Sequence, residues 1–185
     1  MGASRSNRIA LAALLGALGN VLAIISMIFG NIHPQIAIDL SHVATVMAAF
    51  SLGPSWATLV GFLISIVPFI RFGLLGSLGP LIGSLIFPGK AMTGLFAGIL
   101  ARKDYRPLIA LTLGYIPESL FTWATFKLWI PIFAPQLSSW ITDALIYGIL
   151  MKAWVEILAI GALSELLIPK VKGVIPYSLL NESSC

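Results

Sequence analysis

The feature that most constrains this chain is a series of long apolar stretches that carry almost no charge. The first runs from Ile9 to Phe29 without a single charged side chain. Only 10% of the 185 residues are charged and 58% are hydrophobic, whereas a soluble domain has about 25% charged residues. Such a chain cannot cover a water-soluble surface with polar groups. Its composition therefore predicts an all-α integral membrane protein and excludes a disordered chain.

The apolar stretches and the breakers between them predict six transmembrane helices in one membrane domain. A spanning helix needs about 20 residues, so 1–185 leaves room for six or seven helices with short loops. Basic residues precede the first stretch, as in a secretory signal, but that stretch is long enough to span and no small-x-small cleavage site follows it. The predicted helices cover 9–29, 43–52, 56–72, 90–101, 107–127 and 140–167.

Residues 73–89 are apolar but rich in Gly, Pro and Ser. Irregular backbone is tolerated at membrane depth only where protein covers it or where it lines a cavity. We therefore expect a structured outer loop or a re-entrant segment over 73–89.

The basic residues predict that both termini face the cytoplasm. Six helices place the two termini on one side, and cytoplasmic loops carry an excess of Lys and Arg. Lys152 falls within the last predicted helix, and three basic residues fall on the opposite side: Arg71, Lys90 and Lys127. The other seven fall on the side of the termini: Arg5, Arg8, Arg102, Lys103, Arg106, Lys170 and Lys172. They are not interleaved with aromatic residues as in a nucleic-acid-binding patch, so no nucleic-acid partner is expected.

Motifs for catalysis, nucleotides or metals are missing from the sequence. The segment Ser84–Ala91 resembles a phosphate loop but lacks its first glycine and its closing Ser or Thr. Two histidines and one cysteine, Cys185, do not make a usual zinc site or an internal disulfide. No nucleophile and base form a recognisable pair. We expect no enzymatic activity, no cofactor and no metal.

Ionisable residues inside the apolar stretches are candidates for ligand contact, because burying them is costly. Glu118 lies midway along the fifth predicted helix, and Tyr115 and Thr122 share its face. It makes either a structural hydrogen bond or a ligand contact. Lys152 and Glu156 are four residues apart in the last helix. They either pair with each other or supply a pocket cation for a polar ligand group.

Several other polar and aromatic residues have two interpretations. Asp39 and His42 face water or line the mouth of a pocket, and Lys127 and Asp143 fall near the outer boundary, where solvent is the simpler interpretation. The tryptophans near the outer ends of the last two helices form an interfacial belt or stack on a flat ligand. They are Trp123, Trp129 and Trp140.

The first helix carries small residues at four-residue spacing, Ala12-x-x-x-Gly16 and Ala13-x-x-x-Ala17. Small residues let two helix backbones approach closely in lipid. This surface either packs within the chain or docks another subunit.

These elements together resemble the substrate-binding S-components of energy-coupling factor (ECF) vitamin transporters. The resemblance covers essentially the whole chain. It rests on the order and spacing of several motifs more than on any single motif. Its parts are Ala13–Ala17, Ile38–Ser41, Leu52–Pro54 before an apolar helix, Lys90–Gly98, and Lys152 in the last helix.

The resemblance implies a six-helix subunit in the plasma membrane of a prokaryote, which binds a small water-soluble vitamin or precursor near the outer face. It implies that Ala13, Gly16 and Ala17 dock on a transmembrane coupling subunit, which joins two cytoplasmic ATPases. Transferred to this chain, the cavity would be lined by residues near Asp39, Lys90, Thr93, Glu118, Thr122, Trp123, Tyr147 and Lys152.

The identity of the vitamin is open at this point. The Asp39–Ser41 segment and Lys152 are most similar to riboflavin-binding members. The asparagine that those members often place before the lysine is missing here, because Ile149, Leu150 and Met151 precede Lys152. Glu118 and Trp123 would suit the cation of thiamine, and the mixed charge permits pantothenate. The alternatives to an S-component are a stand-alone proton- or cation-coupled transporter, with Glu118, Asp143 and Glu156 as relays, and an intramembrane enzyme or structural subunit.

Overall fold

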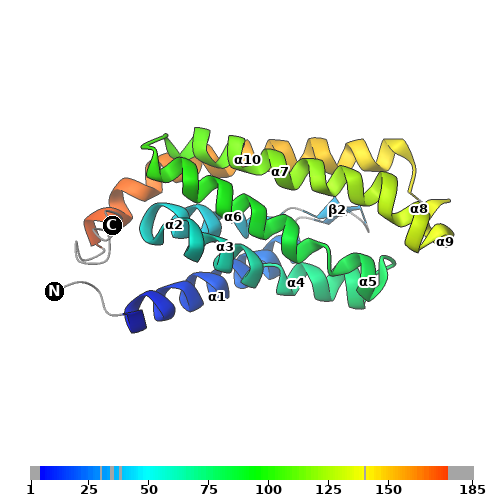
Figure 1. Ribbon diagram of the computed structural model, residues 1–185, viewed down its shortest axis with the longest axis horizontal. Helices are drawn as coiled ribbons and strands as arrows, with labels where there is room; N and C mark the ends of the chain where they lie inside the picture. The colour runs from blue at the N-terminus through cyan, green and yellow to red at the C-terminus, as the bar shows by residue number, and fades with distance from the viewer. Residues whose placement is uncertain (1–4, 30, 34–35, 38, 140, 175–185) are drawn as a thin grey trace.

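A computed structural model describes residues 5–29, 31–33, 36–37, 39–139 and 141–174 of the chain, and these residues are almost entirely helical (Figure 1). A short antiparallel hairpin, β1 (Asn31–His33) and β2 (Ile36–Ala37), follows the first helix. Two segments form π-helix, η1 (Phe69–Leu74) and η2 (Thr125–Trp129). The α-helices are α1 (Arg5–Phe29), α2 (His42–Leu52), α3 (Pro54–Leu63), α4 (Ile66–Pro68), α5 (Gly79–Gly83), α6 (Ile86–Arg102), α7 (Pro107–Ala124), α8 (Ile130–Phe133), α9 (Pro135–Ser138) and α10 (Asp143–Val174).

Within the described residues, four helical stretches are long and apolar enough to cross a membrane. They are α1, the continuous stretch Pro54–Leu74 formed by α3, α4 and η1, the stretch Gly79–Arg102 formed by α5 and α6, and Asp143–Lys170 of α10. Helix α2 is apolar but shorter. The chain is thus an all-α protein with the helices of a membrane protein.

The expected loop over 73–89 is wrong for most of that range. Only the turn at 75–78 separates the two long stretches, and helix resumes at Gly79. Gly79 has a φ of +73°, and Pro80 occupies the first turn of α5, where its missing N–H costs nothing. A Cβ on Gly83 would lie 2.3 Å from the Cα of Gly73. The breakers therefore form a tight turn and a close helix contact.

Glycines bring α3 and α6 into backbone contact at the centre of the bundle. A Cβ on Gly94 would lie 2.1 Å from the carbonyl oxygen of Ala57, and one on Gly98 would lie 2.4 Å from the Cα of Pro54. Close approach of this kind gains van der Waals packing where lipid offers no hydrophobic drive between helices. This contact fixes where α6 presents its side chains.

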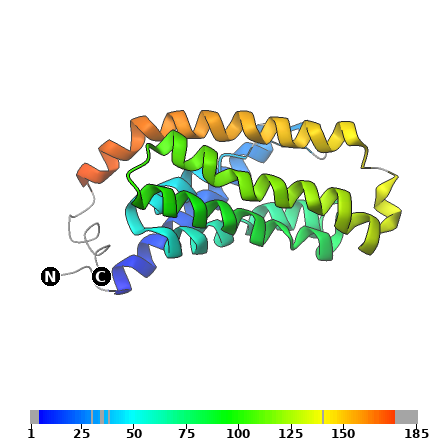
Figure 2. The ribbon, with the colours of Figure 1, turned by 45° about the horizontal axis from the view of Figure 1, so that its top comes forward.

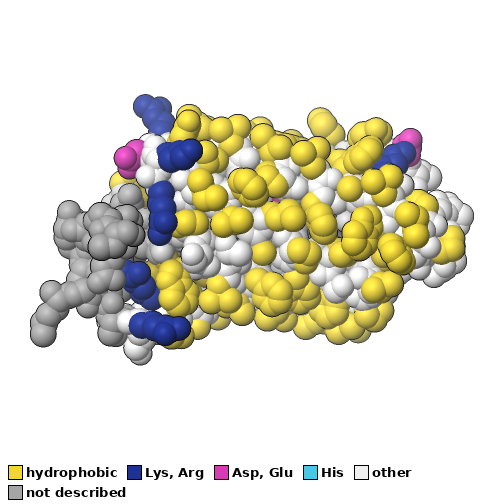
Figure 3. Space-filling view, in the orientation of Figure 1, with side chains coloured by type: hydrophobic (Ala, Val, Ile, Leu, Met, Phe, Trp, Pro, Cys, Tyr) yellow, Lys and Arg dark blue, Asp and Glu magenta, His cyan; other side chains and the backbone are white. Residues whose placement is uncertain are grey.

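The two described ends of the chain lie at the same end of the bundle, while α5, α8 and α9 lie at the other (Figure 1). Helix α10 runs beside α7 along the length of the bundle (Figure 2). Basic side chains gather at the end where α1 begins, and apolar side chains cover the middle of the visible face (Figure 3). Basic residues occupy the α1 start, the α6–α7 turn and the α10 end: Arg5, Arg8, Arg102, Lys103, Arg106 and Lys170.

Candidate functional site

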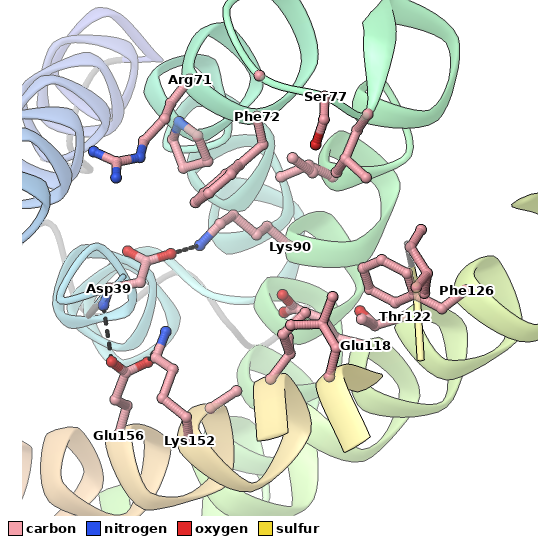
Figure 4. A pocket seen from close by; sticks show the side chains of 18 of the residues that line it. Asp39, Arg71, Phe72, Ser77, Lys90, Glu118, Thr122, Phe126, Lys152 and Glu156 are labelled. Carbon is pink, nitrogen blue, oxygen red and sulfur yellow. Dashed lines mark hydrogen bonds and ion pairs between the residues drawn. The ribbon is translucent and has the colours of Figure 1, made fainter. Parts of the chain in front are cut away.

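A cavity of about 800 Å³ lies between the α1–α2 connection, α4, η1, α6, α7 and α10. Its volume falls in the usual range for a small-molecule site, and its wall is mainly apolar with a few polar groups, as such sites are. Figure 4 shows the charged and aromatic residues that reach it from these elements. The charged lining residues are Asp39, Arg71, Lys90, Glu118, Lys152 and Glu156.

The ammonium of Lys90 is fully occupied by the α1–α2 connection and the first residue of α2. Its Nζ lies 2.5 Å from Asp39 Oδ2, 3.0 Å from Ser41 Oγ and 3.3 Å from His42 Nε2. An ammonium has three N–H donors, and here each faces one acceptor. Lys90 is only 4% exposed. It therefore ties the connection to α6.

The same contacts fix the protonation of His42. Because Lys90 offers only donors, the His42 Nε2 that faces it must accept, and the ring proton sits on Nδ1. His42 Nε2 is also 3.7 Å from Glu118 Oε1. With a lone pair toward Glu118, His42 does not act as a cation for that carboxylate.

Glu118 projects from α7 and is 9% exposed. Its Oε2 accepts a hydrogen bond of 2.5 Å from Thr93 Oγ1 on α6. In the described part of the chain, no lysine or arginine forms an ion pair with it. Glu118 also borders a smaller chamber of about 90 Å³, lined in part by Phe121 and Phe126.

Lys152 and Glu156 pair with each other along α10, with Lys152 Nζ 2.8 Å from Glu156 Oε2. The backbone N–H of Asp39 donates to Glu156 Oε1 at 3.1 Å. Asp39 thus reaches α6 through its side chain and α10 through its backbone, as the dashed lines of Figure 4 show.

The pKa of Asp39 is held well below its ordinary value. Burial of the carboxyl opposes ionisation, but the adjacent Lys90 ammonium and the hydrogen bonds from Lys90 and Ser41 outweigh it. A carboxylate this close to a cation and two donors favours its charged form. The Asp39–Lys90 ion pair is therefore stable across the neutral range.

The residues predicted to bind a substrate divide into three groups. Thr93 is fully buried behind Glu118, and Trp123 and Tyr147, 38% and 54% exposed, lie on the outside of the bundle. None of these three lines the cavity. The remaining five line it: Asp39, Lys90, Glu118, Thr122 and Lys152.

Arg71 and Phe72 also line the cavity and were not predicted as site residues. The Arg71 Cζ lies 5.5 Å from the Phe72 ring centroid. An arginine inside the apolar run before Gly73 was the available signal, and it was counted only among the basic residues on the side opposite the termini. The short π-helix η1 turns this side chain inward, and π-helical turns recur at functional sites.

The small-residue surface of α1 separates into two rows. Gly16 is buried, and a Cβ there would lie 2.9 Å from Leu63, so this residue packs within the chain. Ala13 and Ala17 are exposed. Only the second row is therefore free for another subunit.

The other charged pair predicted near the outer boundary, Lys127 and Asp143, forms an exposed ion pair. No described group of three or more His, Cys, Asp or Glu side chains is arranged to hold a metal. Trp140 and Cys185 lie outside the described residues.

No known protein family, curated protein or solved structure matches this chain at a significant level.

Proposed function

We propose that this protein is the substrate-binding membrane subunit of an ECF-type vitamin importer. It captures a small water-soluble vitamin or precursor in the 800 Å³ cavity, which opens toward the outer face of the plasma membrane of a prokaryote. The single observation that carries the proposal is this cavity, built from apolar walls and a few fixed charges inside a bundle of apolar helices. It acts by binding, and separate subunits hydrolyse ATP.

The proposed arrangement has six crossings with both termini in the cytoplasm. The basic residues at the α1 start, the α6–α7 turn and the α10 end support this orientation through the positive-inside bias. Helix α2, with 11 residues, spans only about 16 Å, so it is the shortest of the proposed crossings. Helix α7 crosses together with η2 and α8.

In this proposal the exposed row of α1, at Ala13 and Ala17, docks on a transmembrane coupling subunit that joins two cytoplasmic ATPases. Small exposed residues on a membrane helix permit close approach of a second helix. Ligand capture and docking use different parts of the molecule.

The test is to purify the chain in detergent and to identify any bound small molecule by denaturing release and mass spectrometry. The protein is then titrated with a panel of water-soluble vitamins and precursors. Ala153 lines the cavity, so Ala153→Phe fills it and should abolish binding. Ala162→Phe, on an exposed position of the same helix, is the matched control and should bind normally. Equal binding by both variants would contradict the proposal.

A second candidate is a stand-alone proton-coupled transporter. The contacts that join Asp39, Lys90, His42 and Glu118 favour it, because linked ionisable groups inside a membrane can relay protons. Substrate uptake by the isolated chain in vesicles, driven by a proton gradient, would support this candidate. Binding without such uptake supports the S-component.

A further inference from the structure

We propose that the ligand is an organic cation and that Glu118 holds its positively charged nitrogen. This inference rests on the proposed function, since it assumes that the cavity binds a small molecule, and it adds the chemical class of that molecule.

The first step is the charge balance of the cavity. Two of its three acids are neutralised by the chain: Asp39 lies 2.5 Å from Lys90, and Glu156 lies 2.8 Å from Lys152. Glu118 is the third, and no lysine or arginine of the described residues forms an ion pair with it.

The second step concerns the neighbours of Glu118. The three N–H donors of Lys90 face Asp39, Ser41 and His42, so none is left for Glu118. His42 turns an accepting Nε2 toward Lys90 and Glu118. The only hydrogen bond that the Glu118 carboxylate receives from the described residues is that of Thr93. Burying a carboxylate without a countercharge is unfavourable, and a cation from the cavity would relieve that cost.

The third step is the aromatic surroundings. Tyr115 and Phe126 line the cavity beside Glu118, and Phe121 lines the adjoining chamber of about 90 Å³. Aromatic faces attract a desolvated cation. The chamber is lined mainly by apolar groups and offers room for a small alkyl group next to that cation. Figure 4 shows Glu118, Thr122 and Phe126 together, on the other side of the cavity from Asp39.

A neutral or anionic ligand fits this wall less well. A neutral ligand would leave Glu118 without a countercharge, and an anion would be repelled by it. Elsewhere in the cavity the Asp39–Lys90 and Lys152–Glu156 pairs are each neutral overall. Arg71 lies beside Phe72 on η1, apart from Glu118 (Figure 4), and does not form an ion pair with it.

The experiment is calorimetric titration of the purified full chain with thiamine, riboflavin and pantothenate, which are respectively cationic, neutral and anionic near pH 7. It also uses the matched pair pyridoxamine and pyridoxine, an amine and its alcohol. The variants are Glu118→Gln and, as control, Glu165→Gln, which lies away from the cavity on α10. The amide oxygen introduced by Glu118→Gln can still accept the Thr93 hydrogen bond, so this variant should fold.

We expect a cationic compound to bind one-to-one, about 100-fold tighter than its uncharged counterpart. Glu118→Gln should lose about 100-fold in affinity for that cation, and Glu165→Gln should bind as the wild type does. The comparison of amine with alcohol on the wild type needs no variant, so it holds even if Glu118→Gln fails to fold.

One result would overturn the inference while the proposed function stands. In that result a neutral or anionic compound binds one-to-one, its binding is kept in Glu118→Gln, and its binding is lost in Ala153→Phe. Binding of no compound of any charge to the wild type would overturn both. A cation that binds equally to wild type and Glu118→Gln would show that another group holds it, and would also overturn the inference.

Discussion

Lys90 and Glu118 lie on neighbouring helices of the same cavity, yet the chain provides a full set of partners for one charge and not for the other. Lys90 has a partner for each of its three donors. The Glu118 carboxylate accepts one hydrogen bond and forms no ion pair with a lysine or arginine among the described residues. A buried charge with a complete set of partners is part of the fold, because removing any partner is costly. A buried charge with an incomplete set is available to a ligand.

The Lys90 cluster, made of Lys90, Asp39, Ser41 and His42, holds the α1–α2 connection over the cavity. Asp39 adds a contact to α10 through its backbone N–H and Glu156. The cluster therefore links three parts of the cavity wall, whereas Glu118 is supported only by Thr93 on the adjacent helix.

The largest expected effect is that of Lys90→Met. It leaves Asp39 in its site without a countercharge, and we expect a loss of about 3 kcal/mol in the free energy of unfolding. Thermal unfolding in detergent measures it. Lys127→Met is the control, because its ion pair with Asp143 is exposed and such pairs contribute less than about 1 kcal/mol. Adding Asp39→Asn to Lys90→Met should recover part of the loss. If Lys90→Met is no worse than Lys127→Met, the cluster is not structural.

Glu118→Gln should not lower the free energy of unfolding as Lys90→Met does. The amide removes a buried charge and keeps the Thr93 hydrogen bond, so the unliganded variant should be as stable as the wild type or more stable by about 1 kcal/mol. The same unfolding assay, performed without ligand, tests this expectation. Destabilisation comparable to that of Lys90→Met would mean that Glu118 belongs to the fold as Lys90 does.

Thr93→Val should lower ligand affinity less than Glu118→Gln does. It removes the hydrogen bond that orients Glu118 and keeps the buried shape, so ligand affinity should fall about tenfold with little change in unfolding temperature. Titration with whichever compound binds the wild type measures the change. Affinity equal to that of the wild type would show that Thr93 does not position the carboxylate.

The smallest effect is that of mild acid on the Lys90 cluster. The pKa of Asp39 is lowered in the fold, so its stabilising contribution is present above the ordinary carboxyl pKa of about 4 and is lost only as pH falls through the lower folded value. The stability difference between wild type and Asp39→Asn should therefore stay constant from about pH 8 to about pH 5. A difference that disappears within this range would contradict the Asp39–Lys90 ion pair.

The sequence allowed the helical class and much of the cavity wall to be predicted. Glu118 and Lys152 stand out because a charge inside an apolar stretch needs a reason, and both line the cavity. Tyr147 was placed there only through the resemblance to a family, and Trp123 through that resemblance or through stacking on a flat ligand. Both face outward. The rotation of α7 and α10 about their axes decides this, and it depends on how the helices pack.

The glycine-rich segment 73–89 shows the same limit. Its composition is compatible with a loop or with helices in close contact, and only the approach of Gly73 to Gly83 selects the second. The two rows of α1 likewise look equivalent in sequence, and packing against Leu63 buries Gly16 while Ala13 and Ala17 stay exposed.

The sequence by itself determined that this chain is a bundle of apolar helices, because a chain with so few charges must bury its backbone polar groups within helices when lipid surrounds it. It also determined which ionisable residues are costly to bury. Only the tertiary structure decided which of those charges are neutralised. Asp39 and Lys90 are far apart in the chain and meet because α6 packs beside α2, whereas no such partner from the described residues reaches Glu118. Pairing depends on distances of a few ångströms between elements, and these are set by helix packing.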